Sequence, residues 1–152
     1  MDFSLLQVVI AAETDIVQVR SRTRRLAELV GFDLQDQTRI TTAVSEIARN
    51  TYEYARGGRI SFRLTGETRY KNFEIFVRDR GPGISPEHWS RVFERFYKVD
   101  RARPREAGGF GLGLAITKHL VHVLGGRIWT EAAREGGQVF YIALPKEALT
   151  GT

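Results

Sequence analysis

The spacing of hydrophobic positions divides the chain into helix-like and strand-like segments. In three segments the apolar side chains recur every three to four residues, which is the period of an amphipathic helix. Each of these segments is followed by glycine, a residue that commonly ends helices. The pattern therefore predicts three main helices, over residues 15–30, from a cap at Asp33 to about Ala55, and over residues 112–124.

Five further segments are typical of β-strands. The runs RISFRL and FEIFVRD alternate apolar and polar side chains, as half-buried antiparallel strands do. The predicted strands are residues 4–12, 59–64, 73–79, 127–132 and 138–144, with Pro145 ending the last one. Between the third strand and the third helix, Ser85 and Pro86 are typical of the cap and first residue of a short helix. This order of elements predicts a two-layer α/β sandwich, with a mixed, mostly antiparallel sheet of about five strands covered on one face by three main helices.

The length of 152 residues suits a single domain over residues 1–152, with one core. The sequence contains no cysteine, which excludes a disulfide framework and a thiolate metal site and fits a reducing compartment. The N-terminal stretch MDFSLLQVVIAAETD has no basic start, and no apolar run approaches the roughly 18 residues of a membrane span. We therefore expect a cytoplasmic protein without a membrane segment.

The net charge of +5 permits weak binding to polyanions, but no recognised nucleic-acid motif is present. Six basic residues gather before the third helix, at Arg91, Arg95, Lys98, Arg101, Arg103 and Arg105. Two interpretations stay open, a solvated mobile surface and an electropositive flap beside a phosphate. We expect no specific nucleic-acid partner, and the sequence leaves the oligomeric state open.

A glycine-rich stretch, AGGFGLGLAI at residues 107–116, leads directly into the third predicted helix. Glycines allow the backbone to approach a ligand, and the N–H groups at a helix N-terminus attract anions. The stretch is not a P-loop, because Leu114 and Ala115 stand where Lys and Ser or Thr are required. The upstream residues do not form a strand, and the glycine spacing does not fit a dinucleotide fingerprint.

Two other positions carry candidate chemistry. Glu46 and Asn50 are four residues apart and therefore share a helix face, where their oxygens can hold a hard cation and orient a water. Asp79 ends an apolar strand immediately before Gly81-Pro82-Gly83, where a carboxylate can accept a hydrogen bond from an exocyclic amine. Taken alone, each feature is also typical of an ordinary polar helix face or a turn.

The three features together, in this order, resemble the GHKL (Bergerat-fold) ATP-binding superfamily along nearly the whole chain. In that resemblance Glu46 and Asn50 form the N-box, residues 79–83 the first glycine box and residues 109–114 the second. The superfamily includes histidine-kinase catalytic domains, anti-sigma serine kinases, gyrase-type ATPases and Hsp90.

The resemblance implies ATP and Mg²⁺ as cofactors and gives each position a role. Asn50 would bind Mg²⁺, Asp79 the adenine amine, and Glu46 would act as the general base or orient a water, which also places it beside the metal. Gly81 and Gly83 would shape the base pocket, beneath a mobile lid over about residues 97–110. The remaining positions implied to contact the nucleotide are Lys98, Arg105, Gly109, Gly111, Leu112, Gly113 and Leu114.

The two halves resemble different branches of the superfamily. Residues 1–84 resemble the switch-type serine protein kinases of bacterial stress signalling, including Glu46 at the head of the N-box. Residues 89–145 resemble a histidine-kinase catalytic domain, with Phe93 and Phe96 as aromatic residues of its F-box or simply as core residues. In the last predicted strand, the segment around Val139 lacks the Ser or Thr residues that the family usually carries there. Two explanations fit the different resemblances of the two halves. The chain is either a natural intermediate lineage or a chimera joined in the first glycine box.

Three functions follow from these resemblances. The first is an Mg-ATP-dependent kinase that phosphorylates Ser or Thr of a partner in trans, such as a STAS-like antagonist domain in sigma-factor signalling. The second is an isolated histidine-kinase catalytic domain of a two-component system, acting on a separate phosphoacceptor domain. The third is a recombined nucleotide-binding scaffold without turnover. The chain carries no phosphoacceptor hairpin around its three histidines, so either kinase would need an acceptor in trans.

Overall fold

The computed structural model describes residues 2–66, 70–97 and 112–147. Most of the predicted lid, residues 98–110, lies outside this part of the chain. The described strands form one five-stranded sheet in the order β1-β2-β3-β5-β4, and every neighbouring pair is antiparallel. The strands are β1 (Phe3–Ile10), β2 (Gly58–Gly66), β3 (Tyr70–Asp79), β4 (Arg127–Ala132) and β5 (Gln138–Glu147). This arrangement narrows the expected mixed, mostly antiparallel sheet to a fully antiparallel one.

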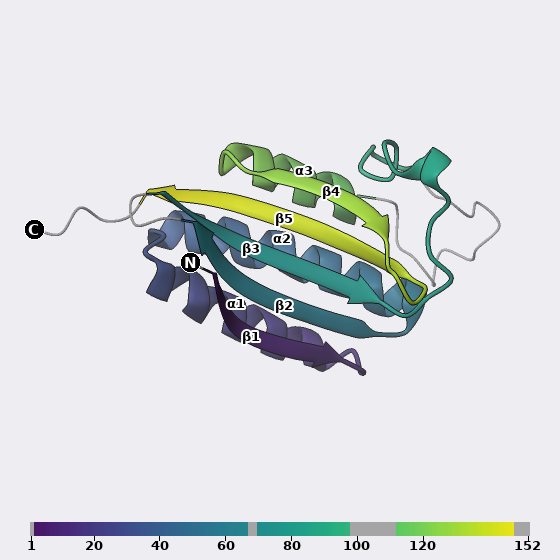
Figure 1. Ribbon diagram of the computed structural model, residues 1–152, viewed down its shortest axis with the longest axis horizontal. Helices are drawn as coiled ribbons and strands as arrows, with labels where there is room; N and C mark the ends of the chain where they lie inside the picture. Colours follow the sequence, from purple (N-terminus) through teal and green to yellow (C-terminus); the bar gives the residue numbers. More distant parts are fainter. Residues whose placement is uncertain (1, 67–69, 98–111, 148–152) are drawn as a thin grey trace, which may run out of the picture.

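Three α-helices cover one face of the sheet, and the other face is open (Figure 1). They are α1 (Asp15–Val30), α2 (Leu34–Ala55) and α3 (Gly113–Val123), and α2 lies between the other two and contacts both. A short 3₁₀-helix, η1 (Pro86–His88), follows β3. The predicted two-layer α/β sandwich is therefore confirmed. No described helix combines the length and apolar character needed to cross a membrane.

Local sequence signals explain the ends of the first two helices. The Asp33 carboxylate accepts a hydrogen bond of 2.7 Å from the backbone N–H of Asp36 and so caps α2. Gly31 ends α1 in the left-handed conformation, with φ of 109°. Arg56, rather than the glycines that follow it, takes the left-handed position after α2, with φ of 62°.

Two local predictions had different outcomes. Ser85 is the N-cap residue of η1 and Pro86 is its first residue, as expected, although the Ser85 side chain makes no capping hydrogen bond and the helix is a single 3₁₀ turn. The Trp89 indole also holds this loop, because its Nε1–H donates to the Ile84 carbonyl at 2.8 Å. The expectation that Pro145 ends the last strand was wrong, because β5 continues to Glu147. Beyond Ala143, β5 pairs with β3 only, and a proline is tolerated where one side of a strand has no partner.

The core lies between the sheet and the helices. In β3, Phe73, Ile75 and Val77 are fully buried under the helices, because alternate residues of a strand point to the same face. The rings of Phe62 and Phe73 stack with centroids 6.0 Å apart. Ile40, Val44 and Ile47 of α2 complete the apolar contact from the helical layer. This core fixes the end of β3, the C-terminal half of α2 and the start of α3 relative to one another.

Candidate functional site

Asp79 stands at the end of β3 with its carboxylate held by two backbone groups. The N–H of Gly81 donates to Oδ1 at 3.0 Å, and the N–H of Gln138 donates to the same oxygen at 3.1 Å. Neither bond involves Oδ2, which keeps its capacity to accept a hydrogen bond from a ligand amine. Burial raises the pKa of this carboxyl above its ordinary value, and the two backbone hydrogen bonds oppose the rise.

Glycines surround this carboxylate because side chains would not fit. A Cβ atom on Gly81 would lie 2.8 Å from the Ala55 Cβ, at the end of α2. A Cβ atom on Gly137 would lie 2.3 Å from the backbone oxygen of Asp79, and Gly137 also has a φ of +89°. Gly83, with φ of +80°, would bring a Cβ to 3.3 Å from the Gly137 oxygen. The first glycine box therefore packs closely against the turn before β5.

Gln138, the first residue of β5, links the loop after β3 to the neighbouring strand β4. Its side chain is fully buried, its Oε1 accepts from the Ile84 N–H at 2.9 Å, and its Nε2 donates to the Thr130 Oγ1 at 2.8 Å. The Thr130 hydroxyl in turn donates to the Val139 carbonyl at 2.8 Å. Sequence reasoning did not select Gln138 or Thr130. The available signal was a large amide, Gln138, in the segment where relatives usually carry hydroxyl residues.

Of the two N-box residues, Glu46 lies against the start of α3. A Cβ atom on Gly113 would lie 3.1 Å from the Glu46 Oε2, so this carboxylate lies against the first residue of α3. Glu46 also forms a long ion pair with Arg49, with 3.9 Å between Oε1 and Nη1. Asn50 is half-buried one turn further along α2, and its side chain makes no hydrogen bond to another residue in the described ranges. The buried Thr117 Oγ1 lies 2.9 Å from the Gly113 carbonyl of its own helix and 3.2 Å from the Ala43 carbonyl of α2, so its one proton is shared between these two acceptors where the helices meet.

Of the remaining residues predicted to contact the nucleotide, two lie within the described part of the chain and four lie outside it. Leu112 precedes α3 at its N-cap position without a side-chain capping bond, and Leu114 is partly buried against the core, so packing accounts for the position of Leu114. Lys98, Arg105, Gly109 and Gly111 lie outside the described residues. The part of the chain that the structure describes therefore brings together Asp79 with Gly81 and Gly83, and Glu46 with Gly113.

The donor set fits Mg²⁺ only in combination with a phosphate ligand. No group of three or more His, Asp or Glu side chains that could hold a metal occurs in residues 2–66, 70–97 and 112–147. Glu46 and Asn50 offer one carboxylate and one amide oxygen, which is the sparse protein contribution that Mg²⁺ accepts when phosphates and waters complete its shell. The residues thus fit a nucleotide-borne cation better than a metal held by protein side chains alone.

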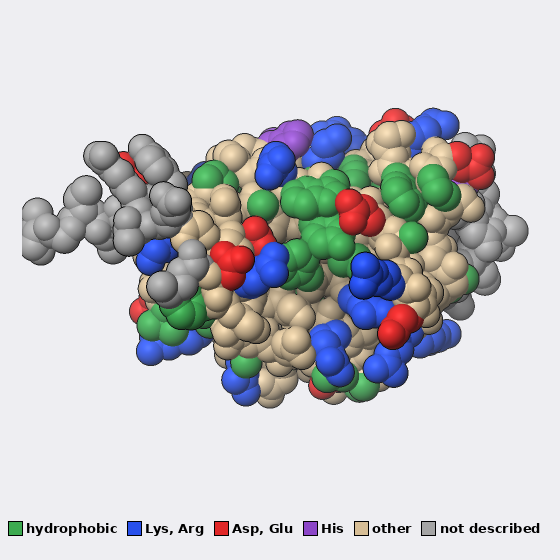
Figure 2. All heavy atoms as spheres, in the orientation of Figure 1, with side chains coloured by type: hydrophobic (Ala, Val, Ile, Leu, Met, Phe, Trp, Pro, Cys, Tyr) green, Lys and Arg blue, Asp and Glu red, His purple; other side chains and the backbone are tan. Residues whose placement is uncertain are grey.

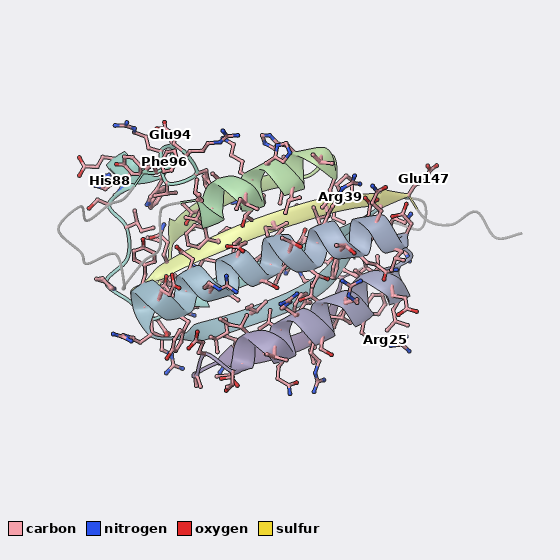
Figure 3. The ribbon with its side chains drawn as sticks, turned by 180° about the vertical axis from the view of Figure 1, so that it is seen from behind. Arg25, Arg39, His88, Glu94, Phe96 and Glu147 are labelled. Carbon is pink, nitrogen blue, oxygen red and sulfur yellow. The ribbon has the colours of Figure 1, made fainter. Side chains whose placement is uncertain are left out.

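The F-box aromatics have different environments. Phe93 is buried and meets Phe140 edge to face, with ring centroids 6.1 Å apart. Phe96 is 69% exposed and has a positive φ of 64°, which is uncommon for a residue with a side chain. The same segment contains a hydrogen bond between His88 Nδ1 and the Tyr97 hydroxyl. Figure 3 shows His88, Glu94 and Phe96 together at one end of the molecule, away from Arg25.

Comparisons with known proteins agree with this geometry. The family model described as histidine kinase-, DNA gyrase B- and HSP90-like ATPase matches residues 35–148. The chain is 40% identical over 139 residues to the sensor-like histidine kinase SenX3 of Mycobacterium tuberculosis, covering 90% of this chain and 32% of that protein. It is 38% identical over 115 residues to the sensor protein kinase WalK of Staphylococcus saprophyticus, covering 75% of this chain and 19% of that protein. The chain thus spans about a third or less of these relatives.

A solved structure extends the likeness over the whole chain. The mycobacterial sensor histidine kinase MprB matches with a TM-score of 0.60 and 25% identity, covering 98% of this chain and 99% of that one. The fold of full-length ShkA, solved with AMPPNP, matches with a TM-score of 0.61 over 90% of this chain and 30% of that one, at 23% identity.

These matches favour the histidine-kinase alternative over the serine/threonine kinase that stood first among the predictions. The SenX3 alignment spans residues of both halves within one protein, at 139 residues. Neither a chimera nor an anti-sigma factor receives support from the comparisons.

Proposed function

This chain belongs to the histidine kinase-, DNA gyrase B- and HSP90-like ATPase family, and on that premise we propose that it is the Mg-ATP-binding catalytic domain of a histidine kinase. The sensor histidine kinases among its relatives support the choice of kinase class. The acceptor would be a histidine on a separate phosphoacceptor domain.

The observation that carries the proposal is the geometry of Asp79. Both backbone hydrogen bonds fall on Oδ1, and glycines line the neighbouring loop, so Oδ2 is the carboxylate oxygen that an adenine amine would reach. A partly buried carboxylate fixed in this way favours a ligand with a donor, since a ligand without one would displace water from Oδ2 and leave it unpaired. This arrangement supports adenine rather than a base that presents an acceptor at the same position.

The residues of α2 would act at the other end of the nucleotide. Mg-ATP, when bound, supplies the γ-phosphoryl group. Asn50 would give its amide oxygen to the metal, and Glu46 would orient a water or take a proton from the acceptor at Oε2, the oxygen nearest to Gly113. The N-terminus of α3 would place backbone N–H groups and the positive end of the helix dipole toward the phosphates.

A histidine of a phosphoacceptor domain would receive the phosphoryl group, and its nitrogen would form the new bond as the bridging bond of ATP breaks. Of the histidines in this chain, His119 and His122 are exposed on α3, and His88 bonds to Tyr97.

Two experiments test the proposal in order. Calorimetric titration with AMPPNP, with and without Mg²⁺, should show binding that Mg²⁺ strengthens and that Asp79→Asn weakens. Radiolabelled ATP and a histidine-containing dimerisation domain should then give an acid-labile phosphoprotein. Acid-stable label on a STAS-like domain instead would restore the serine/threonine kinase, and nucleotide binding without transfer to either acceptor would favour the scaffold.

A further inference from the structure

The open face of the sheet carries a broad groove on the side away from the helices. Its volume is about 1170 Å³, and residues of β1, β2, β3 and β5 line it. Figure 2 shows hydrophobic side chains gathered across this face, with Lys and Arg side chains and also Asp or Glu side chains beside them. The charged residues of the lining are Arg56, Arg59, Arg63, Arg78, Arg80 and Glu135. Most of its lining lies on the sheet face away from Glu46, and at one end the groove reaches Ala55, the last residue of α2, and Gly81 of the first glycine box.

The charge of this groove is poorly balanced by the protein itself. Glu135 lies 3.6 Å from Arg78 but is 86% exposed, so water screens this pair. Arg63 pairs with Glu74 of β3 at 2.8 Å. Arg59 donates only to the Gln7 amide, at 3.4 Å, and Arg56 and Arg80 form no ion pair with another residue in the described ranges. The face therefore keeps a net positive charge that a partner could match.

Aromatic rings hold two arginines in place at this face. Arg63 lies over Phe76, with 4.8 Å from Cζ to the ring centroid, and Arg127 lies over Trp129 at 5.4 Å. Tyr141 connects the two rings, stacking on Trp129 at 5.2 Å and meeting Phe76 edge to face at 5.3 Å. Guanidinium groups held by rings lose less conformational entropy when they bind a carboxylate. We call this set of stacked side chains, Arg63, Phe76, Tyr141, Trp129 and Arg127, the arginine and aromatic ladder. Its fixed contacts distinguish it from a group of mobile surface charges.

These contacts favour one kind of occupant. A second copy of the chain would place two arginine-rich faces against each other, and like charges at an interface oppose association. Stacked bases of a single-stranded nucleic acid would need aromatic faces, but Arg63, Arg127 and Tyr141 already engage the rings. Carboxylates would reach the arginines without disturbing the ladder. We propose that the open face of the sheet docks an acidic segment of a partner protein.

The test uses fluorescence anisotropy with a fluorescein-labelled peptide of alternating glutamate and alanine. The double variant Arg59→Glu with Arg78→Glu reverses two charges in the groove. Its matched control, Arg20→Glu with Arg22→Glu, makes the same change in net charge at exposed positions of α1, on the helical side. Thermal melting of each variant checks that the fold is intact.

The groove variant should weaken peptide binding roughly tenfold or more at low salt, because two attractions become repulsions, whereas the control should change it less than about twofold. Equal weakening in both variants would overturn the proposal, since net charge alone would then explain binding. So would the absence of measurable peptide binding, tighter binding of oligothymidylate of equal charge, or a dimer in sedimentation that the groove variant dissociates. None of these readouts depends on nucleotide, so the result is independent of the proposed kinase function.

Discussion

The two ends of the proposed nucleotide site differ in how far the protein itself engages their polar groups. At the base end, Asp79 receives two backbone bonds, and Gln138 joins Ile84 to Thr130 through its buried amide. At the phosphate end, Glu46 has a 3.9 Å ion pair with an exposed Arg49, and Asn50 has no hydrogen bond to another described residue.

This difference assigns separate tasks to the two ends. A carboxylate that backbone groups hold in place can select a ligand with little reorganisation, because its position does not depend on the ligand. A carboxylate and an amide with few fixed partners can instead adjust to a metal ion and phosphates. We therefore expect substitutions at the base end to affect folding and selectivity, and substitutions at the phosphate end to affect the contribution of Mg²⁺.

The largest expected effect is a difference in stability between alanine substitutions at two adjacent glycines at the base end. Gly136 and Gly137 both have positive φ, of 95° and 89°, but a Cβ on Gly137 would lie 2.3 Å from the Asp79 oxygen, whereas a Cβ on Gly136 would meet nothing within 4 Å. Gly136→Ala should cost only the backbone term of about 1–2 kcal/mol in the free energy of unfolding. Gly137→Ala should cost several kcal/mol more, or prevent folding, because strand and turn must move apart.

Urea unfolding of both variants, followed by circular dichroism, measures the difference. Gly136→Ala is the matched control, since it introduces the same atom at a similar backbone angle. Equal loss of stability in both variants would contradict the close packing of the glycine box against the turn before β5.

The next effect concerns ligand selection. Asp79→Asn keeps an oxygen for the Gly81 and Gln138 N–H groups but replaces Oδ2 with a donor, which would oppose an adenine amine. Loss of a charged hydrogen bond is worth about 1.5–3 kcal/mol, so AMPPNP affinity should fall roughly tenfold to a hundredfold. Calorimetry measures the change, and retained affinity in Asp79→Asn would contradict the assignment of this carboxylate to the base.

The elements of the fold follow from local patterns in the sequence. The bounds predicted for the first helix, 15–30, and for the fourth strand, 127–132, match α1 and β4. Hydrophobic period and capping residues act within a few positions, so a single sequence displays them directly. The error at Pro145 arose because strand pairing decides the outcome there, since β4 pairs with β5 only as far as Ala143.

The candidate site was less accessible to sequence reasoning. Motif residues such as Asp79 and Glu46 were selected through a family resemblance, and their roles stay predictions. Gln138 was missed because its partners lie far away along the chain, 59 residues to Asp79 and 54 to Ile84. The spacing of hydrophobic residues within a short segment gives no information about contacts between residues so far apart in the sequence. The arginine and aromatic ladder was missed for the same reason, since four strands supply it.

At the phosphate end, Asn50→Ala tests the contribution of the metal. The variant removes an amide oxygen but no hydrogen bond to a described residue, so the free energy of unfolding should change little. The affinity for AMPPNP in Mg²⁺ should fall about tenfold, toward the value without Mg²⁺, because one metal ligand is worth a few kcal/mol at most here. An unchanged Mg²⁺ dependence would move the metal site away from Asn50.

The smallest effect is the pH dependence that the partly buried Asp79 carboxylate gives to stability. Burial raises the pKa of Asp79 in the folded chain above the ordinary value of 3.8. As pH rises through 3.8, the unfolded chain releases this proton first, so ionisation favours unfolding until pH passes the raised folded pKa. Below this interval both states hold the proton, and above it both have lost the proton, so the penalty stays constant there. Asp79→Asn cannot ionise, and its stability relative to the unchanged protein should therefore grow with pH across the interval and then level off.

Denaturant unfolding of the two proteins at a series of pH values measures the difference. A difference that shrinks as pH rises would mean that the backbone N–H groups of Gly81 and Gln138 outweigh burial, and the base end would then hold its carboxylate as a stabilised anion.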